Sequence, residues 1–333
     1  MQAAPPRTPP LGVAFDSSLD GEIDQVLALA MLFAFDSRRQ IRLAALSTSR
    51  FNLLNVAFLD LIARFYAGEQ GGDTVAERLV RPIGMSTEGT QDSNQAPPML
   101  SAVLANHVAD GRGYPRARAV LNDTADPVAV IRNGLSAQID QNGAVVLAGP
   151  PVNLLGVIAR PDGRAWVTSK TRVLSIAAGR FAAGPVDPMI RGDVTGFRRL
   201  LAEWPSPIIM AGTELSEALP FPGRSLESGI AWATHHPIVD AYRAFRTTPY
   251  DAPSRSLAAA LQAVSPDQPY FDVSPPGTIT IADDGRTTFS PSPNGRHRYL
   301  IAKADQQERV LQVFVEMVTA QPPPRAGRGG PRA

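Results

Sequence analysis

Residues 11–29 read LGVAFDSSLDGEIDQVLAL and contain the clearest signal of the fold. Residues 11–15 are a short apolar run that ends at Asp16, a polar turn follows, and residues 23–35 are apolar on nearly every side of a helix. Such a pattern predicts a short buried strand, a loop, and a helix that packs on a sheet inside a large core. We therefore expect a strand–loop–helix unit here.

The same alternation of strands and helices continues along the chain. Further strands are expected over residues 41–47, 79–83, 144–148, 173–177 and 208–210, with helices over residues 53–66, 152–159 and 197–204 between them. Strands that alternate with helices form βαβ units with right-handed crossovers. The sequence therefore predicts an α/β fold, a mostly parallel twisted sheet with helices on both faces.

The C-terminal part of the sequence changes character. Residues 277–281 alternate between apolar and polar, Asp283-Asp284-Gly285 is a turn signal, and residues 286–289 form the expected returning strand. This pattern predicts a β-hairpin. Residues 306–317 are predicted to form a closing amphipathic helix. We expect one domain over residues 11–320, between a disordered leader, residues 1–10, and a disordered Pro/Gly/Arg tail, residues 321–333.

Composition excludes several classes of protein. The 333 residues are 44% hydrophobic and 19% charged, which are ordinary values for a globular protein with a sizeable core. A net charge of +1, from 32 basic and 31 acidic residues, gives no sustained field for binding nucleic acid. No apolar run reaches the roughly 18 residues that a membrane helix needs, and the absence of cysteine excludes disulfides and thiolate sites. Neither nucleic acid nor a membrane is therefore the expected partner.

The loop after the first expected strand is acidic. It contains Asp16, Asp20, Glu22 and Asp24, and in parallel α/β sheets ligands bind outside the carboxyl ends of the strands. Four close carboxylates repel one another unless a cation or hydrogen-bond donors neutralise them. We interpret Asp20 or Glu22 as a cap of the following helix. Asp16 is the strongest candidate for chemistry because it ends a buried strand.

This stretch resembles the signature of the nucleoside hydrolases, the inosine/uridine-preferring N-ribohydrolases, which is D-x-D-x-G-S-D-x-D-D followed by a small and aliphatic helix. Residues 147–155 resemble the family's G-P-L-T-N turn, and residues 212–215, 236–242 and 298–300 are similar to an exported bacterial branch. The resemblance runs from about residue 11 to about residue 322. It implies hydrolysis of the N-glycosidic bond of a ribonucleoside, a nucleoside or sugar ligand, and a homo-oligomer.

In this family a calcium ion is bound by the second and last Asp of the signature, by a backbone carbonyl of the turn and by a distant C-terminal Asp. The second Asp is also the general base. The matching positions here are Ser18, Gln25 and Val152, with either Ser256 or His236 at the C-terminal position. A shorter alignment places Asp20 at the position of the base and calcium ligand.

Calcium prefers charged, hard oxygen ligands, and a serine hydroxyl does not take a proton from water near neutral pH. We therefore expect calcium to be absent or weakly bound and calcium-dependent catalysis to be impaired or lost. A non-catalytic relative that binds a nucleoside or ribose, and a structural subunit, are the alternatives.

The adjacent His235 and His236 are further candidates, as a general acid at the leaving base or as ligands of a softer metal such as zinc. Adjacent helical residues point about 100° apart, so we expect one of them to serve the site. Trp232 is a candidate for stacking on a nucleobase, with a core tryptophan as the alternative.

Three polar residues are candidates for binding ribose. Asn153 lies in the segment that resembles the family turn, with a helix N-cap as its alternative or additional role, Asn52 (or Asn55) follows the second expected strand, and Asp24 belongs to the acidic loop. Asp187 and Asp193 are interpreted as solvated loop carboxylates.

The polar, proline-rich residues 1–6 are compatible with the start of a mature chain after removal of a signal peptide. Together with the resemblance to an exported branch, this favours a periplasmic or secreted protein. A flexible terminus of a cytoplasmic protein is the alternative.

Overall fold

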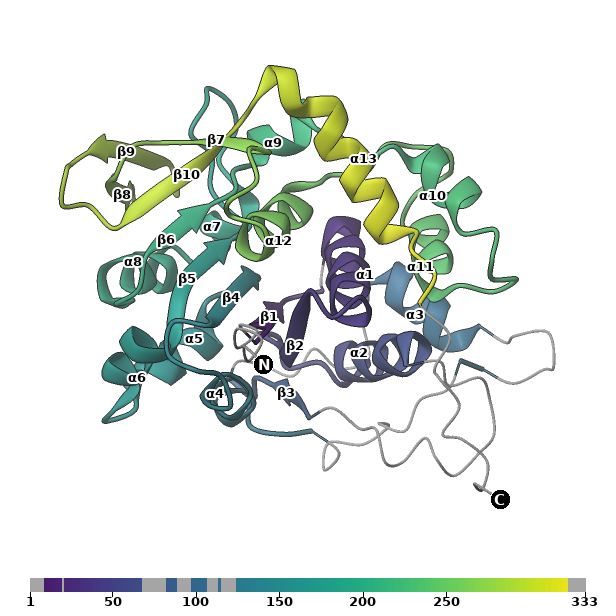
Figure 1. Cartoon of the computed structure of the whole chain (residues 1–333), viewed down its shortest axis with the longest axis horizontal. Coiled ribbons are helices and arrows are strands. Elements are labelled where there is room, and N and C mark those ends of the chain that lie inside the picture. The colour runs from purple at the N-terminus through teal and green to yellow at the C-terminus, as the bar shows by residue number, and fades with distance from the viewer. Residues whose placement is uncertain are drawn as a thin grey trace, which may run out of the picture.

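The computed structural model describes residues 9–19, 21–67, 82–88, 97–106, 113–114 and 124–322. A sheet runs through the middle of the molecule and helices cover both of its faces (Figure 1). The leader through residue 8, Asp20, residues 79–81 of one expected strand and the tail from residue 323 lie outside the described residues.

Six strands form the parallel part of the sheet in the order β3-β2-β1-β4-β5-β6, so the expected mostly parallel sheet is confirmed. Their bounds are β1 Leu11–Ser17, β2 Ile41–Thr48, β3 Ile83–Met85, β4 Gly143–Ala148, β5 Thr171–Ile176 and β6 Ile208–Met210.

A smaller C-terminal group of strands extends this sheet beyond β6. β10 (His297–Ala302) runs parallel to β6, and β8 (Gly277–Ile281) and β9 (Thr287–Pro291) follow it as the expected hairpin, with Gly285 at a positive φ of 89° in the turn. β7 (Phe271–Val273) pairs with β10 on a separate branch.

One face of the sheet is covered by helices that share a hydrophobic core with β1 and β2. They are α1 Ile23–Ser37, α2 Leu53–Tyr66, α3 Pro98–Ala105, α9 Thr213–Ala218, α10 Gly223–Gly229, α11 Pro237–Phe245, α12 Arg255–Val264 and α13 Gln307–Val318, the last preceded by the short 3-10 helix Ala304–Gln306.

The opposite face has its own core, built on α4 Pro127–Ser136, α5 Val152–Ala159, α6 Gly163–Lys170, α7 Pro188–Gly192 and α8 Val194–Glu203. Val13 and Phe15 of β1 point into the first core and Ala14 points into the second. A strand covered on both faces is continuously apolar, which explains why residues 11–15 do not alternate between apolar and polar side chains.

Helix α1 is buried along residues 23–35 because α2, α11, α12 and α13 all pack around it. This arrangement explains its apolar character on every side. No helix in the described ranges is long and apolar enough to span a bilayer.

The strand order reverses at β1, whose neighbours are β2 on one side and β4 on the other. In doubly wound sheets the crevice for ligands opens at such a reversal, outside the carboxyl ends of the strands. The fold therefore places the ends of β1 and β4, and the loops that follow them, at the favoured position for a binding site.

Candidate functional site

Asp16, the sixth residue of β1, has a fully buried side chain. Its Oδ1 accepts a hydrogen bond from Ser47 Oγ at 2.6 Å and another from Asn153 Nδ2 at 2.8 Å, whereas its Oδ2 is buried and has no partner in the described part of the chain. Burial raises the pKa of Asp16 to about 6, although the two hydrogen bonds lower it. The carboxyl group can therefore gain or lose a proton just below neutral pH.

The sheet and helix α5 hold these partners in place. Ser47 lies beside Asp16 in the parallel register of β1 and β2, and Asn153 sits in the first turn of α5, directly after β4. Asn153 Nδ2 also donates to the Thr48 carbonyl at 3.0 Å. The alternative role of Asn153 as an N-cap is wrong: Pro151 occupies that position, and the Asn153 amide reaches Asp16.

Ser18 and Gln25, which match calcium ligands of the family, hydrogen bond to each other. Gln25 Nε2 lies 3.2 Å from Ser18 Oγ, and Gln25 Oε1 accepts from the backbone N–H of Leu19 at 2.7 Å. Both side chains are buried and neutral. Asn55 Nδ2 donates to the Ser18 carbonyl at 2.7 Å, so Asn55 also belongs to this group.

Asp24 and Ser256 meet at the junction of α1 and α12. The backbone N–H of Ser256 donates to Asp24 Oδ2 at 2.8 Å, while Asp24 Oδ1 is buried with no partner within the described ranges. Of the two positions proposed for the C-terminal ligand, Ser256 is therefore the one that contacts the acidic loop.

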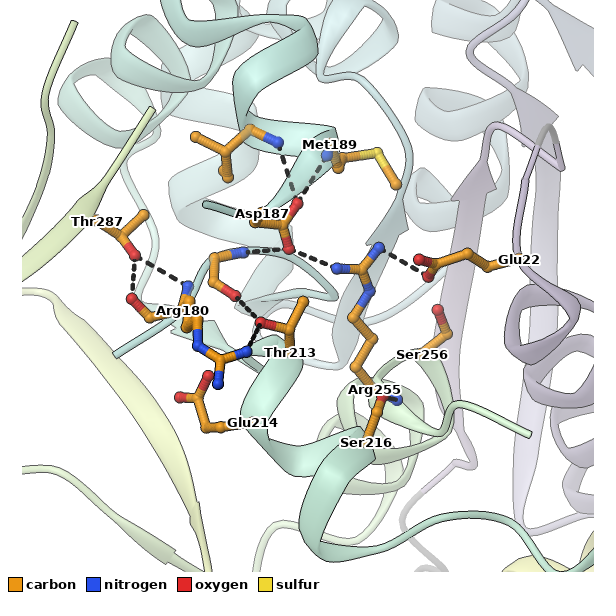
Figure 2. Close-up of polar contacts among 12 residues, drawn as sticks. Glu22, Arg180, Asp187, Met189, Thr213, Glu214, Ser216, Arg255, Ser256 and Thr287 are labelled. Atoms are coloured by element: carbon orange, nitrogen blue, oxygen red, sulfur yellow. Dashed lines mark hydrogen bonds and ion pairs between the residues drawn. The ribbon is translucent and has the colours of Figure 1, made fainter. Parts of the chain in front are cut away.

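Arg255 was not anticipated from the sequence, yet its guanidinium lies between two carboxylates of the site (Figure 2). Its Nη2 pairs with Glu22 Oε2 at 2.7 Å, and its Nη1 pairs with Asp187 Oδ2. Asp187 Oδ1 accepts from the N–H of Met189 at 2.7 Å, which fixes this carboxylate at the start of α7.

Two interpretations of acidic residues are corrected by these contacts. Glu22 stands at the N-cap position of α1 but makes no side-chain cap, because its carboxylate turns to Arg255. Asp187 is buried rather than solvated, because it is paired with the same guanidinium. Asp193 is a cap, since its Oδ1 accepts from Gly196 N at 2.8 Å.

The histidine candidate lies in an aromatic cluster between α2 and α11. The His236 ring packs against Phe65, with 4.6 Å between ring centroids, and against Tyr66 and Trp232. Its Nδ1 accepts from Ile238 N at 3.2 Å, and burial lowers its pKa to about 3, so the ring is neutral near pH 7.

Trp232 donates from Nε1 to the Thr319 carbonyl at 2.9 Å, and His235 is half-buried. These residues lie outside the hydrogen-bonded group around Asp16 as far as the structure describes it. Asn52 caps α2 through Leu54 N, and Asn55, one turn further on, is the residue that reaches the loop after β1.

Several buried polar atoms at or just after the ends of β1 and β2 have no hydrogen-bond partner among the residues that the structure describes. They are Asp16 Oδ2, Ser17 Oγ, Asp24 Oδ1, Ser49 Oγ and Asn55 Oδ1. Buried polar groups are normally hydrogen-bonded, so these unpaired atoms are candidates for binding polar groups from outside the chain. Hydroxyl groups of a sugar fit such a set because they both donate and accept.

The donor set does not fit the family's calcium site. Ser18, Gln25 and Ser256 carry no charge, and the first two bind each other. Among the residues with described positions, no three His, Asp or Glu side chains are arranged to hold a metal ion. Calcium affinity falls as charged oxygen ligands are removed.

Gly149, just after β4, allows the loops of the site to approach closely. A Cβ at this position would lie 2.4 Å from Ser49 Oγ and 2.6 Å from Ser18 N. Gly149→Ala is expected to lower the free energy of unfolding by roughly 1–3 kcal/mol in urea denaturation, because the backbone of the loop must shift. Gly192→Ala is the control, since a Cβ there has no neighbour within 4 Å. Equal losses in both variants would contradict this close approach.

No protein-family model matches the sequence, and no curated protein sequence matches it either. Solved structures of similar fold include a plant nucleoside hydrolase, with a TM-score of 0.65, 19% identity, and 94% of this chain and 100% of that chain covered. They also include an inosine-uridine preferring nucleoside hydrolase from Bacillus anthracis, with a TM-score of 0.62, 15% identity, and 92% and 98% covered.

A third similar structure is the type III effector protein XopQ complexed with adenosine diphosphate ribose, with a TM-score of 0.60, 11% identity, and 94% of each chain covered. The strand order and the helices on both faces indicate the same fold as these similar structures. The chain therefore has the fold of the nucleoside hydrolases.

Proposed function

We propose that this chain binds a ribose-containing small molecule, a nucleoside or a relative of one, at the carboxyl ends of β1 and β4. We further propose that it does so without calcium and that hydrolysis of the N-glycosidic bond is strongly impaired. The observation that carries both proposals is the hydrogen bond between Ser18 and Gln25 beside a retained Asp16 whose Oδ2 has no partner.

Two observations support ribose as the ligand class. The unpaired oxygens at the ends of β1 and β2 match the alternating donors and acceptors of a sugar. A structure of similar fold, XopQ, is described in complex with adenosine diphosphate ribose, which contains ribosyl groups.

Impaired hydrolysis follows from the chemistry of the loop. Attack of water on the anomeric carbon needs a base, and general bases contribute about 10²–10⁴ in rate. Ser18 is a neutral hydroxyl that is hydrogen-bonded to Gln25, so it is no base at neutral pH. Asp16 is ionisable, but Ser47 and Asn153 both donate to its Oδ1, so only its Oδ2 is left to accept a hydrogen bond from a ligand. Asp16 is better suited to accepting a ribose hydroxyl than to activating water.

Calorimetric titration of the full chain with ribose and inosine, in the presence of a chelator, tests the binding proposal. We expect binding that the chelator does not weaken and that Asn153→Ala reduces, because that variant removes a donor to Asp16. Asp283→Ala is the matched control, since the Asp283 side chain is 99% exposed.

Hydrolysis of p-nitrophenyl riboside, with and without calcium chloride, tests the catalytic proposal. We expect no increase on adding calcium. Tight calcium binding together with calcium-dependent turnover would identify a working hydrolase. The absence of binding to any ribosyl ligand would instead favour a structural subunit.

A further inference from the structure

Arg255 brings a buried positive charge to the acidic end of the site. Its side chain is 3% exposed, and its guanidinium contacts Glu22 from the loop after β1 and Asp187 from the segment after β5 (Figure 2). Asp24 adds a third negative charge that acts on the same guanidinium. One arginine thus pairs with carboxylates from two separate segments of the chain.

The charges in this group depend on one another. Burial lowers the pKa of Arg255, but Asp187, Glu22 and Asp24 together more than offset this and leave it above its ordinary value. Burial, followed by the charge of Asp24, raises the pKa of Glu22 to about 7, and Arg255 opposes that rise. Without the guanidinium, these carboxylates would face one another in a largely buried space, which is strongly unfavourable.

The backbone fixes the position of Arg255. The N–H groups of Ser254 and Arg255 both donate to Ser216 Oγ at 3.0 Å, and the next residue, Ser256, donates its N–H to Asp24. The arginine therefore stands at the start of α12, directly beside the position at which the family resemblance implies a metal-binding carboxylate.

We propose that Arg255 is a built-in cation that neutralises Glu22, Asp24 and Asp187, so that this end of the sheet needs no metal ion to be stable. A guanidinium keeps its proton and has no open coordination position for water. Arg255 therefore replaces the charge of a metal ion but not its ability to activate water. This inference rests on the proposed function only in its assignment of a calcium-free site, and it makes no assumption about the ligand.

Thermal unfolding of the full chain tests this role. We expect the wild-type protein to have the same Tm in calcium chloride as in sodium chloride of equal ionic strength. Arg255→Ala is expected to lower the Tm by about 6–10 °C, because it leaves buried carboxylates unpaired. Ethylguanidinium, which has the shape and charge of the deleted group, is expected to recover several degrees in this variant and none in the wild type.

Ethylurea is the matched compound, since it has nearly the same shape without the charge. Equal recovery by ethylurea would overturn the proposal in favour of a packing role. An unchanged Tm in Arg255→Ala, or a saturable stabilisation of the wild type by calcium, would also overturn it. If Arg255→Ala does not fold, Arg255→Lys and Arg255→Gln decide the question. The lysine variant must be the more stable of the two, and equal stabilities would overturn the proposal.

Ribose binding by the wild type is measured separately from these Tm values. Failure of the proposed function would appear as the absence of ribose binding, with the response to ethylguanidinium intact. Failure of the built-in cation would appear in the Tm values, whatever the wild type binds.

Discussion

As the pH rises from about 4 to about 8, the free energy of unfolding of the Asp16→Asn variant is expected to increase by up to about 3 kcal/mol relative to that of the wild type. Burial raises the pKa of Asp16 from 3.8 to about 6, so the folded protein holds this proton more tightly than the unfolded chain does. The resulting stabilisation is fully present below the unfolded pKa and is lost as the pH rises through the folded pKa. The wild type loses this contribution on the way to neutral pH.

The asparagine variant has no charge to bury at any pH. Its side-chain carbonyl can still accept from Ser47 and Asn153, which both donate to the same oxygen of Asp16. Glu22, whose pKa is raised to about 7, is present in both proteins, so its contribution cancels in the difference. Urea denaturation of both proteins over a series of pH values measures the effect.

Asp283→Asn is the control for this experiment, because the Asp283 side chain is 99% exposed and its removal should leave the pH dependence of the wild type unchanged. Stability curves for the wild type and Asp16→Asn that stay parallel from acid to neutral pH would show that the Asp16 carboxyl does not titrate with a raised pKa.

Packing alone does not require a buried carboxyl group whose ionisation near neutral pH costs stability. Proteins depart from local stability rules mainly at functional sites. Asp16 has one oxygen held by two donors and the other buried with no partner among the described residues, and this arrangement supports the proposed role in ligand binding.

Much of the fold could be predicted from the sequence because its signals are local. The helices over residues 53–66 and 152–159 and the strand over residues 208–210 have the predicted bounds. Strand β1 continues two residues past the predicted end, through Asp16 and Ser17. These residues have polar side chains, but their backbones still pair with β2 and β4. The hydrophobic pattern of a sequence indicates which side chains are buried and not which backbone groups pair, so it misses strand ends that carry polar residues.

The site was less accessible to sequence reasoning because it depends on contacts between distant segments. Asp16 and Asn153 are 137 positions apart, and no local pattern indicates that they meet. Arg255 lies next to Ser256, which the family alignment singled out, but nothing in a run of serine, arginine and leucine shows that the guanidinium turns inward. One signal was present: an acidic loop without a cation implies a neutralising partner elsewhere in the chain.

Restoring carboxylates at the loop after β1 is expected to create a response to calcium. In Ser18→Asp/Gln25→Asp, the two residues that now hydrogen bond to each other become adjacent negative charges near Asp16 and Asp24. Without calcium this variant is expected to be several kcal/mol less stable than the wild type, because buried like charges repel. Calcium is expected to increase the free energy of unfolding of this variant by about 3–4 kcal/mol, the gain given by a ligand at about 100 to 1,000 times its Kd.

Ser18→Asn/Gln25→Asn is the matched control, since it has nearly the same size and hydrogen-bonding groups without the charges. Urea denaturation with calcium chloride, against sodium chloride of equal ionic strength, should separate the two variants, and only the aspartate pair should respond. An equal response in both would mean that calcium acts elsewhere on the protein. Hydrolysis of p-nitrophenyl riboside by the aspartate pair should rise with calcium, because an aspartate at position 18 supplies a base that the wild-type serine does not.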